Sequence, residues 1–225
     1  MIEVKDATYR YAKSDTPVFA GFSAQFARGE ITAITGKNGC GKTTLTKLLA
    51  GILHPAAGRV SIDGLDVSNM DLFEIGQHVG YLFQNPNRQL FCDTVFNEVA
   101  YGLRNLGFDE NQAKKETEQY LDYFGLLGSR DAYPGKLSHG EKQRLALAAV
   151  LALNTDYLVL DEPTTGLDVR RQRELGELLL DLRREFSCGI MFVSHETEFA
   201  ARYADRELTM KNSELEPEFL CPAHP

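Results

Sequence analysis

The sequence GKNGCGKTT, residues 36–44, gives the strongest indication of the fold of this 225-residue chain. It matches the pattern GxxxxGK[ST] and lies between the β-branched run ITAITG, residues 31–36, and the helix-like run TTLTKLLAGIL, residues 43–53. Glycines let successive backbone N–H groups turn toward one anion, and the N-terminus of the following helix adds positive charge. The order strand, loop, helix therefore predicts a phosphate-binding loop within an α/β fold.

The residue types in this loop indicate how a nucleotide would be held. We expect Lys42 to reach the β and γ phosphates and the Thr43 hydroxyl to ligate Mg²⁺. Cys40 lies inside the loop, so one hypothesis is that bound ATP protects it from alkylation; the alternative is a small residue that merely fits. The expected nucleotide contacts from this loop are Gly36, Asn38, Gly39, Cys40, Gly41, Lys42, Thr43 and Thr44.

A second group of polar residues follows the apolar run DYLVLDEP, residues 156–163. This run reads as a strand buried in a parallel sheet, which carries Asp161 and Glu162 to its C-terminal end, where open parallel sheets hold their ligands. Asp161 is expected to hold Mg²⁺ through water, and Glu162 to orient or deprotonate the attacking water. The two groups together predict a P-loop NTPase core, a mostly parallel sheet flanked by helices.

The rest of the chain divides by its hydrophobic pattern. Residues 2–26 alternate apolar with polar residues and predict an N-terminal antiparallel β layer. Helical patterns fill about residues 93–153, with Asp109 as an expected N-cap, and predict an α-helical subdomain inserted between strands. A helix over residues 169–186 and a strand GIMFVSH complete the core. We expect one domain over residues 1–211 and a short, poorly ordered tail over residues 212–225.

The amino-acid composition argues against several classes of protein. Hydrophobic residues make up 43% and charged residues 25%, as in folded globular proteins. Lys and Arg total 24 against 32 Asp and Glu, a net charge of −8 that argues against a nucleic-acid partner. Apolar runs such as residues 145–153 are far shorter than the ~20 residues of a membrane-spanning helix. The 4 cysteines form no CxxC pair, so we expect reduced thiols.

Taken together, these residues resemble the ATPase subunit of ATP-binding cassette (ABC) proteins over about residues 1–210. The resemblance identifies the Walker A loop with residues 36–44, the Q-loop with Gln84, the signature motif with LSHGE at residues 137–141, Walker B with residues 158–161, the D-loop with residues 166–168 and the switch histidine with His195. It also implies that Tyr11 stacks on adenine, and we expect Tyr9 on the same strand face.

This resemblance implies an Mg²⁺-dependent ATP hydrolase. The implied catalytic residues are Glu162, His195, Lys42 and Gln84, and the implied metal ligands are Thr43, Gln84 and Asp161. In the family, a second ATPase chain, identical or homologous, completes the site head to tail, which implies that Ser138 and Gly140 face its γ phosphate. The signature departs from LSGGQ at His139 and Glu141. Ser138 with Glu141 is also a capping box, which predicts a helix from Ser138 whatever its function.

One further stretch bears on the type of transporter. FQNPNRQLF, residues 83–91, with TVFNEVAYGLRNLGF, residues 94–108, resembles the ATPases of energy-coupling factor (ECF) and cobalt-type importers, which take up vitamins and transition-metal ions. This implies an integral membrane partner, met through the Q-loop and helical subdomain with residues 89–91 as anchors, at the cytoplasmic face of the membrane. The alternatives are a soluble ABC ATPase acting on nucleic acid or ribosomes and a non-hydrolysing scaffold. A GTPase is disfavoured because no NKxD motif occurs.

Overall fold

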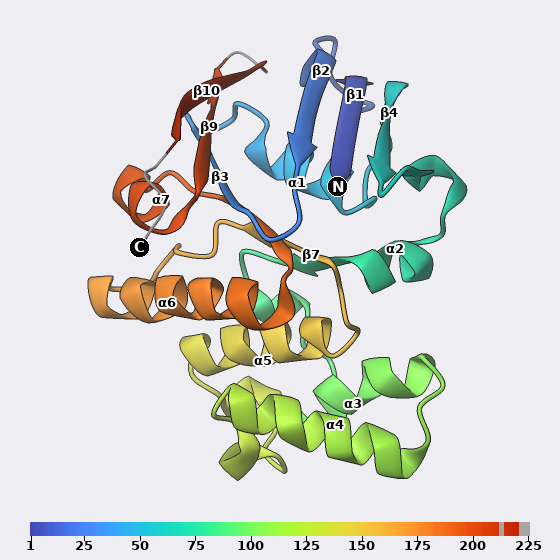
Figure 1. Cartoon of the computed structure of the whole chain (residues 1–225), viewed down its shortest axis with the longest axis vertical. Helices are drawn as coiled ribbons and strands as arrows, with labels where there is room; N and C mark the ends of the chain where they lie inside the picture. Colours follow the sequence, from blue (N-terminus) through green and yellow to red (C-terminus); the bar gives the residue numbers. More distant parts are fainter. Residues whose placement is uncertain (212–213, 221–225) are drawn as a thin grey trace. The chain divides into compact units, whose positions relative to one another are not determined.

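The computed structural model describes residues 1–211 and 214–220 of the chain. It divides into two compact units: the first comprises Met1–Tyr81 with Asp156–Pro225, and the second Leu82–Thr155. The second unit is thus an insertion in the first, and it begins about ten residues earlier than the helical pattern suggested. Figure 1 shows the elements of both units.

A six-stranded sheet is the centre of the first unit, in the order β10-β9-β3-β8-β7-β6. Its strands are β3 (Ile31–Gly36), β6 (Val79–Leu82), β7 (Tyr157–Asp161), β8 (Gly189–Val193), β9 (Arg206–Lys211) and β10 (Glu214–Leu220). Strand β3 runs parallel to β8 and β9, and β7 runs parallel to β8. Every residue of β7 and β8 is buried, which explains why both segments are continuous apolar runs. The predicted α/β core with a mostly parallel sheet is confirmed.

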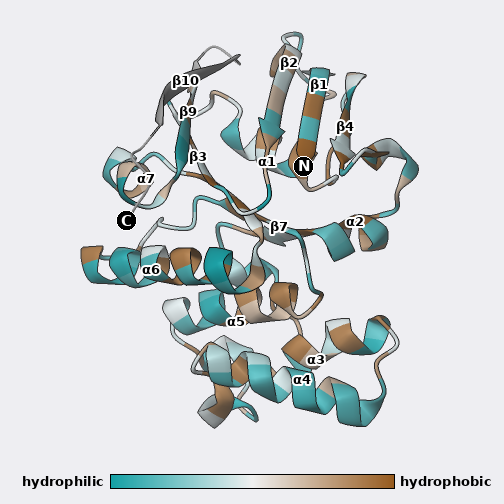
Figure 2. Ribbon diagram, viewed as in Figure 1, coloured by the Kyte–Doolittle hydropathy of each residue, from teal (hydrophilic) through white to brown (hydrophobic). Residues whose placement is uncertain are grey.

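Three helices of the first unit pack on this sheet. They are α1 (Lys42–Leu49), α6 (Val169–Phe186) and α7 (Thr197–Tyr203). Helix α1 contacts β3, β7 and β8, whereas α6 contacts β8 and α7 contacts β3. In α6, the buried residues Leu175, Leu179 and Leu182 follow at one-turn spacing, and the helix carries both hydrophobic and hydrophilic residues (Figure 2). The expected bounds of α6 are confirmed.

A smaller antiparallel sheet in the first unit has the order β2-β1-β4-β5. Its strands are β1 (Ile2–Tyr9), β2 (Phe19–Phe26), β4 (Ala57–Ile62) and β5 (Leu65–Asp66), and α2 (Leu72–His78) follows. Ile2 pairs with Phe26 on one side and with Ile62 on the other, and all three side chains are buried. The predicted N-terminal β layer is confirmed.

The second unit consists of three helices and short turns. The helices are α3 (Val95–Asn105), α4 (Glu110–Tyr123) and α5 (His139–Leu151), and α3 packs against both others. The N-cap predicted at Asp109 and the capping box predicted at Ser138 are confirmed, and the cap of α4 at Asp109 is also a capping box. Within the described residues, none of the helices combines the length and the apolar character that crossing a bilayer requires.

The expected irregular tail needs a correction. Residues 214–220 form β10, which pairs antiparallel with β9, and Pro217 lies opposite Leu208. β10 is at the edge of the sheet. A proline is tolerated in an edge strand because one side of that strand has no neighbouring strand to which an N–H would donate. The three prolines of the tail therefore misled the prediction for this segment. Residues 212–213 and 221–225 lie outside the described part of the chain.

Candidate functional site

The loop between β3 and α1 takes the conformation of a phosphate cradle. Gly36 has φ 144°, and a side chain there would place its Cβ 2.6 Å from the carbonyl oxygen of Met210, so glycine is required. Gly39, at φ 81°, has no atom within 4 Å of the corresponding position. The loop is thus closely packed at its start and faces open space at Gly39, where a ligand has room.

Lys42 is a buried cation held by this loop. Its Nζ donates to the carbonyl oxygens of Gly36 at 2.8 Å and of Lys37 at 3.2 Å, and the residue is 6% exposed. Gly41 is the N-cap of α1 and contributes no side-chain acceptor, so the first-turn N–H groups of α1 have no side-chain cap. An uncapped helix N-terminus beside a lysine ammonium favours an anion.

Thr43 and Asp161 form a pair of oxygen donors beside Lys42. The Thr43 Oγ1 donates to Asp161 Oδ1 at 3.0 Å, joining the first turn of α1 to the end of β7. Burial raises the pKa of Asp161, although hydrogen bonds from Thr43 and Tyr81 act in the opposite direction. A hydroxyl and a carboxylate are the ligand types that Mg²⁺ prefers, and a divalent cation would stabilise the charged carboxylate. The donor set therefore fits Mg²⁺.

The Glu162 carboxylate lies between the ring of His195 and the ammonium of Lys42. Its Oε2 is 2.8 Å from His195 Nδ1 and its Oε1 is 3.9 Å from Lys42 Nζ. Glu162 has φ 51°, a left-handed conformation that costs about 1 to 2 kcal/mol, and its N–H donates to the Val193 carbonyl at 3.2 Å. Because β3, β8 and β7 are neighbours in the sheet, their C-terminal ends bring Lys42, His195 and Glu162 together.

Tyr11 lies in the turn after β1, not on the strand as expected, because β1 ends at Tyr9. Its ring meets the ring of Tyr9 edge to face, with centroids 5.0 Å apart, and its hydroxyl lies 3.0 Å from Thr44 Oγ1. The side chain is 42% exposed. Tyr11 therefore stands beside the start of α1, with ring surface left for another contact.

The remaining predicted residues lie partly in the phosphate loop and partly in the second unit. Asn38 is exposed in the phosphate loop, and Cys40 is half-buried there. Gln84, Ser138 and Gly140 belong to the second unit. Gln84 lies exposed between β6 and the next turn, while Ser138 caps α5 and Gly140 is half-buried in its first turn.

Glu141 closes the capping box of α5. Its Oε2 accepts the Ser138 N–H at 2.8 Å, and Ser138 Oγ accepts the Glu141 N–H at 3.4 Å. These hydrogen bonds lower the pKa of Glu141. The carboxylate by which the signature departs from LSGGQ is therefore bound to its own helix N-terminus.

The sequence did not predict two polar residues at the site, Tyr81 and Thr46. The Tyr81 hydroxyl donates to Asp161 Oδ2 at 3.3 Å, and it lies 3.2 Å from Thr46 Oγ1. Both residues are buried. The available signal was a tyrosine inside the run VGYLFQ, because a buried tyrosine hydroxyl needs a hydrogen-bond partner.

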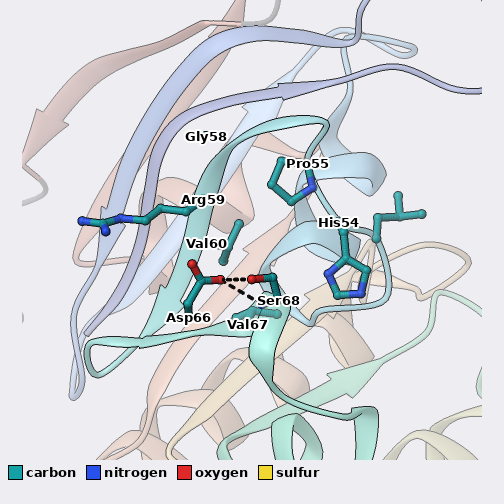
Figure 3. A pocket seen from close by; sticks show the side chains of 9 residues that line it. His54, Pro55, Gly58, Arg59, Val60, Asp66, Val67 and Ser68 are labelled. Carbon is teal, nitrogen blue, oxygen red and sulfur yellow. Dashed lines mark hydrogen bonds between the residues drawn. The ribbon is translucent and has the colours of Figure 1, made fainter.

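A separate small pocket of about 70 Å³ in the first unit lies beside β4 and β5 (Figure 3). His54 and Asp66 line it, and Ser68 Oγ donates to Asp66 Oδ1 at 2.7 Å. Its lining includes none of the predicted site residues.

Comparisons with known proteins agree with this geometry. The sequence profile described as ABC transporter matches residues 19–165. The energy-coupling factor transporter ATP-binding protein EcfA of Methanothermobacter thermautotrophicus is 42% identical over 96% of this chain and 69% of its own length. CbiO1 of Clostridium perfringens, part of the ABC transporter complex CbiONQ, superposes with a TM-score of 0.87 at 32% identity, covering 96% of this chain and 86% of that one.

A dimeric ATP-binding cassette in a post-hydrolysis state with ADP and Pi bound superposes with a TM-score of 0.85 at 25% identity, covering 98% of this chain and 99% of that one. The profile match, the relatives and the shared fold agree on one assignment. The chain belongs to the ABC transporter family, as an ATP-binding subunit.

Proposed function

We propose that this chain is the Mg²⁺-dependent ATP-hydrolysing subunit of an ABC importer of the ECF type. The proposal that the chain hydrolyses ATP depends on one observation: the Glu162 carboxylate lies 2.8 Å from His195 Nδ1 and 3.9 Å from Lys42 Nζ. This arrangement supports Glu162 as a general base that acts beside the cation Lys42, because in-line attack of water on a phosphate needs a positioned base and charge neutralisation.

Each residue of the site would have a separate role in binding or hydrolysing ATP. Lys42 would exchange the two loop carbonyls for β and γ phosphate oxygens, and the N–H groups of residues 36–44 would bind the remaining oxygens. Glu162 would accept a proton from the attacking water. His195, hydrogen-bonded to Glu162 and 52% exposed, would contact the γ phosphate from the other side. Tyr11 would present its exposed ring to the adenine.

Thr43, Asp161 and Gln84 would hold Mg²⁺, which when bound neutralises charge on the phosphate oxygens. The Thr43 and Asp161 oxygens already lie 3.0 Å apart. Asp161 is enclosed by protein, so its carboxylate has a fixed place and needs little ordering when the cation arrives.

The site would be completed by a second ATPase chain, identical or homologous, in a head-to-tail dimer. Ser138 and Gly140 of that chain would meet the γ phosphate at the N-terminus of α5, where backbone N–H groups and the helix dipole favour negative charge. Glu141 adds an opposing carboxylate at this helix end. The solved relative that is a dimer with ADP and Pi supports this arrangement.

The importer assignment draws on the similarity to EcfA and CbiO1. In that role the chain would sit at the cytoplasmic face of the membrane, bound to an integral membrane subunit. The second unit offers an exposed aromatic pair, since Phe91 is 68% and Tyr101 50% exposed and their ring centroids are 5.0 Å apart. This pair follows the Q-loop segment and would meet the membrane partner. The cargo would be a vitamin or a transition-metal ion.

Glu162→Gln tests the hydrolytic role. We expect unchanged ATP binding and a rate of hydrolysis lower by at least ~10², because the amide cannot accept a proton from water. Glu185→Gln, an exposed glutamate of α6, makes the same chemical change away from the site and should hydrolyse at the normal rate. Near-normal turnover of Glu162→Gln would refute the assignment.

The importer role has a separate test. Isolation of the native complex in mild detergent should yield integral membrane proteins together with this chain. Ribosomes or nucleic acid in their place would support a non-transport ATPase.

A further inference from the structure

A chain of buried hydroxyl groups lies behind Asp161, within the first unit. Tyr81 in β6 donates from its hydroxyl to Asp161 Oδ2 at 3.3 Å, and the same hydroxyl lies 3.2 Å from Thr46 Oγ1. Thr46 Oγ1 in turn lies 2.9 Å from the Thr43 carbonyl oxygen, to which it donates. Thr46 is fully buried, and Tyr81 is 9% exposed.

Each hydroxyl group in this series has one proton to donate. Tyr81 and Thr46 bring two hydroxyl protons to three contacts. A carboxylate only accepts, so the Tyr81 proton goes to Asp161, and the Thr46 proton is shared between the Tyr81 oxygen and the Thr43 carbonyl. Tyr81 is thereby oriented by Thr46, and Asp161 by Tyr81.

The two oxygens of Asp161 have different partners. Thr43 holds Oδ1, and Tyr81 holds Oδ2. If Thr43 and Oδ1 turn to a cation, the contact from Tyr81 to Oδ2 can persist and keep the carboxylate plane in place. At 3.3 Å this contact is longer than the usual 2.5 to 3.0 Å of such bonds, so its effect should be modest.

From this geometry we propose that Tyr81, oriented by Thr46, is a positioning residue that sets the affinity of the Thr43 and Asp161 site for the divalent cation. The inference rests on the proposed function of that site. Tyr81 is enclosed by protein and acts through Asp161, so it should change the binding of metal and leave the binding of metal-free nucleotide unaffected. A tyrosine that only filled space could be replaced by phenylalanine without consequence for the metal.

The test uses the purified full chain and two variants that keep the shape of the core, Tyr81→Phe and Thr46→Val. Tyr120→Phe is the matched control, because Tyr120 in the second unit also donates its hydroxyl to a protein oxygen, the Leu151 carbonyl at 3.0 Å. Free Mn²⁺ is followed by electron paramagnetic resonance with the chain in molar excess over ATP, so that nearly all the nucleotide is bound and ATP in solution does not take up the metal. ATP binding in EDTA is measured separately by calorimetry, and thermal unfolding reports on folding.

Tyr81→Phe should weaken Mn²⁺ binding about five- to tenfold and change ATP binding in EDTA by less than twofold. Thr46→Val should weaken Mn²⁺ binding about two- to threefold, and Tyr120→Phe should leave it unchanged. If Tyr81→Phe does not fold, Thr46→Val decides the question by the same criterion.

Mn²⁺ affinity within twofold of the wild type in Tyr81→Phe would overturn the inference. An equal loss of metal and metal-free nucleotide binding would overturn it too, because that pattern indicates general damage to the site. A wild-type chain that binds no Mn²⁺ with ATP would instead contradict the proposed function itself.

Discussion

Replacing Lys42 with alanine probes the phosphate loop most simply. In the structure, the Lys42 ammonium donates to the carbonyl oxygens of Gly36 and Lys37 at 2.8 and 3.2 Å. A unit charge 4 Å from a phosphate oxygen gains about 4 kcal/mol at an effective dielectric constant of 20. Part of this gain is lost because the two carbonyl contacts must be given up. A net loss of about 2 kcal/mol is expected for a charged hydrogen bond, equivalent to roughly 30-fold weaker binding of ATP.

Calorimetric titration with ATP measures this loss, and thermal unfolding checks that the variant is folded. Lys37→Ala is the control, because it removes the same charge from an exposed position of the same loop. We expect the control to bind ATP within about threefold of the wild type, since exposed charges are screened by water and salt. Equal ATP affinities of Lys42→Ala and Lys37→Ala would refute the role of the Lys42 ammonium in phosphate binding.

Three further outcomes follow from the structure. Iodoacetamide should modify the half-buried Cys40 more slowly when ATP is bound, and equal rates with and without ATP would contradict its place in the nucleotide contact. Burial alone would raise the pKa of Asp63, but hydrogen bonds from the amino terminus and Arg28 outweigh it and lower the pKa to about 2. Asp63→Asn should therefore reduce the free energy of unfolding by about 1 kcal/mol at pH 7 and by less at pH 3, where the unfolded chain binds the proton, in urea titrations; a constant difference would count against this. Glu98, 5% exposed, accepts two backbone N–H groups at 3.0 and 2.8 Å, so Glu98→Ala should cost about 2 to 4 kcal/mol in urea unfolding and Glu98→Gln clearly less, and equal losses would refute the role of its oxygens.

Local patterns explain which features could be predicted from the sequence. The phosphate loop is contiguous, so glycine spacing and the flanking strand and helix specify it without knowledge of neighbours. Asp161 and Glu162 could be proposed as site residues because they lie at the C-terminal end of a buried strand, and open parallel sheets bind their ligands at the C-terminal ends of the strands. Helix α6 and the caps at Asp109 and Ser138 likewise depend on residues a few positions apart.

Contacts between distant segments could not be predicted in this way. The contact of Tyr81 with Asp161 joins residues 80 positions apart, and it depends on the order of strands in the sheet. The turn that carries Tyr11 toward Thr44 depends on where β1 ends, which alternation of side chains does not specify. Strand β10 contains Pro217, which weakens any local strand signal, and it forms because β9 offers an open edge.

In the proposed mechanism, one chain binds the triphosphate in its phosphate loop, and the face of a second chain that carries Ser138 and Gly140 closes over it. The mass of the Glu162→Gln variant in solution, measured by analytical ultracentrifugation with and without ATP, tests this claim most directly. We expect the mass of a single chain without nucleotide and twice that mass with ATP. Ser138→Arg should abolish this change without preventing ATP binding. A Glu162→Gln variant that binds ATP and keeps the mass of a single chain, at chain concentrations far above the Kd for ATP, would contradict closure of the site by a second copy of this chain.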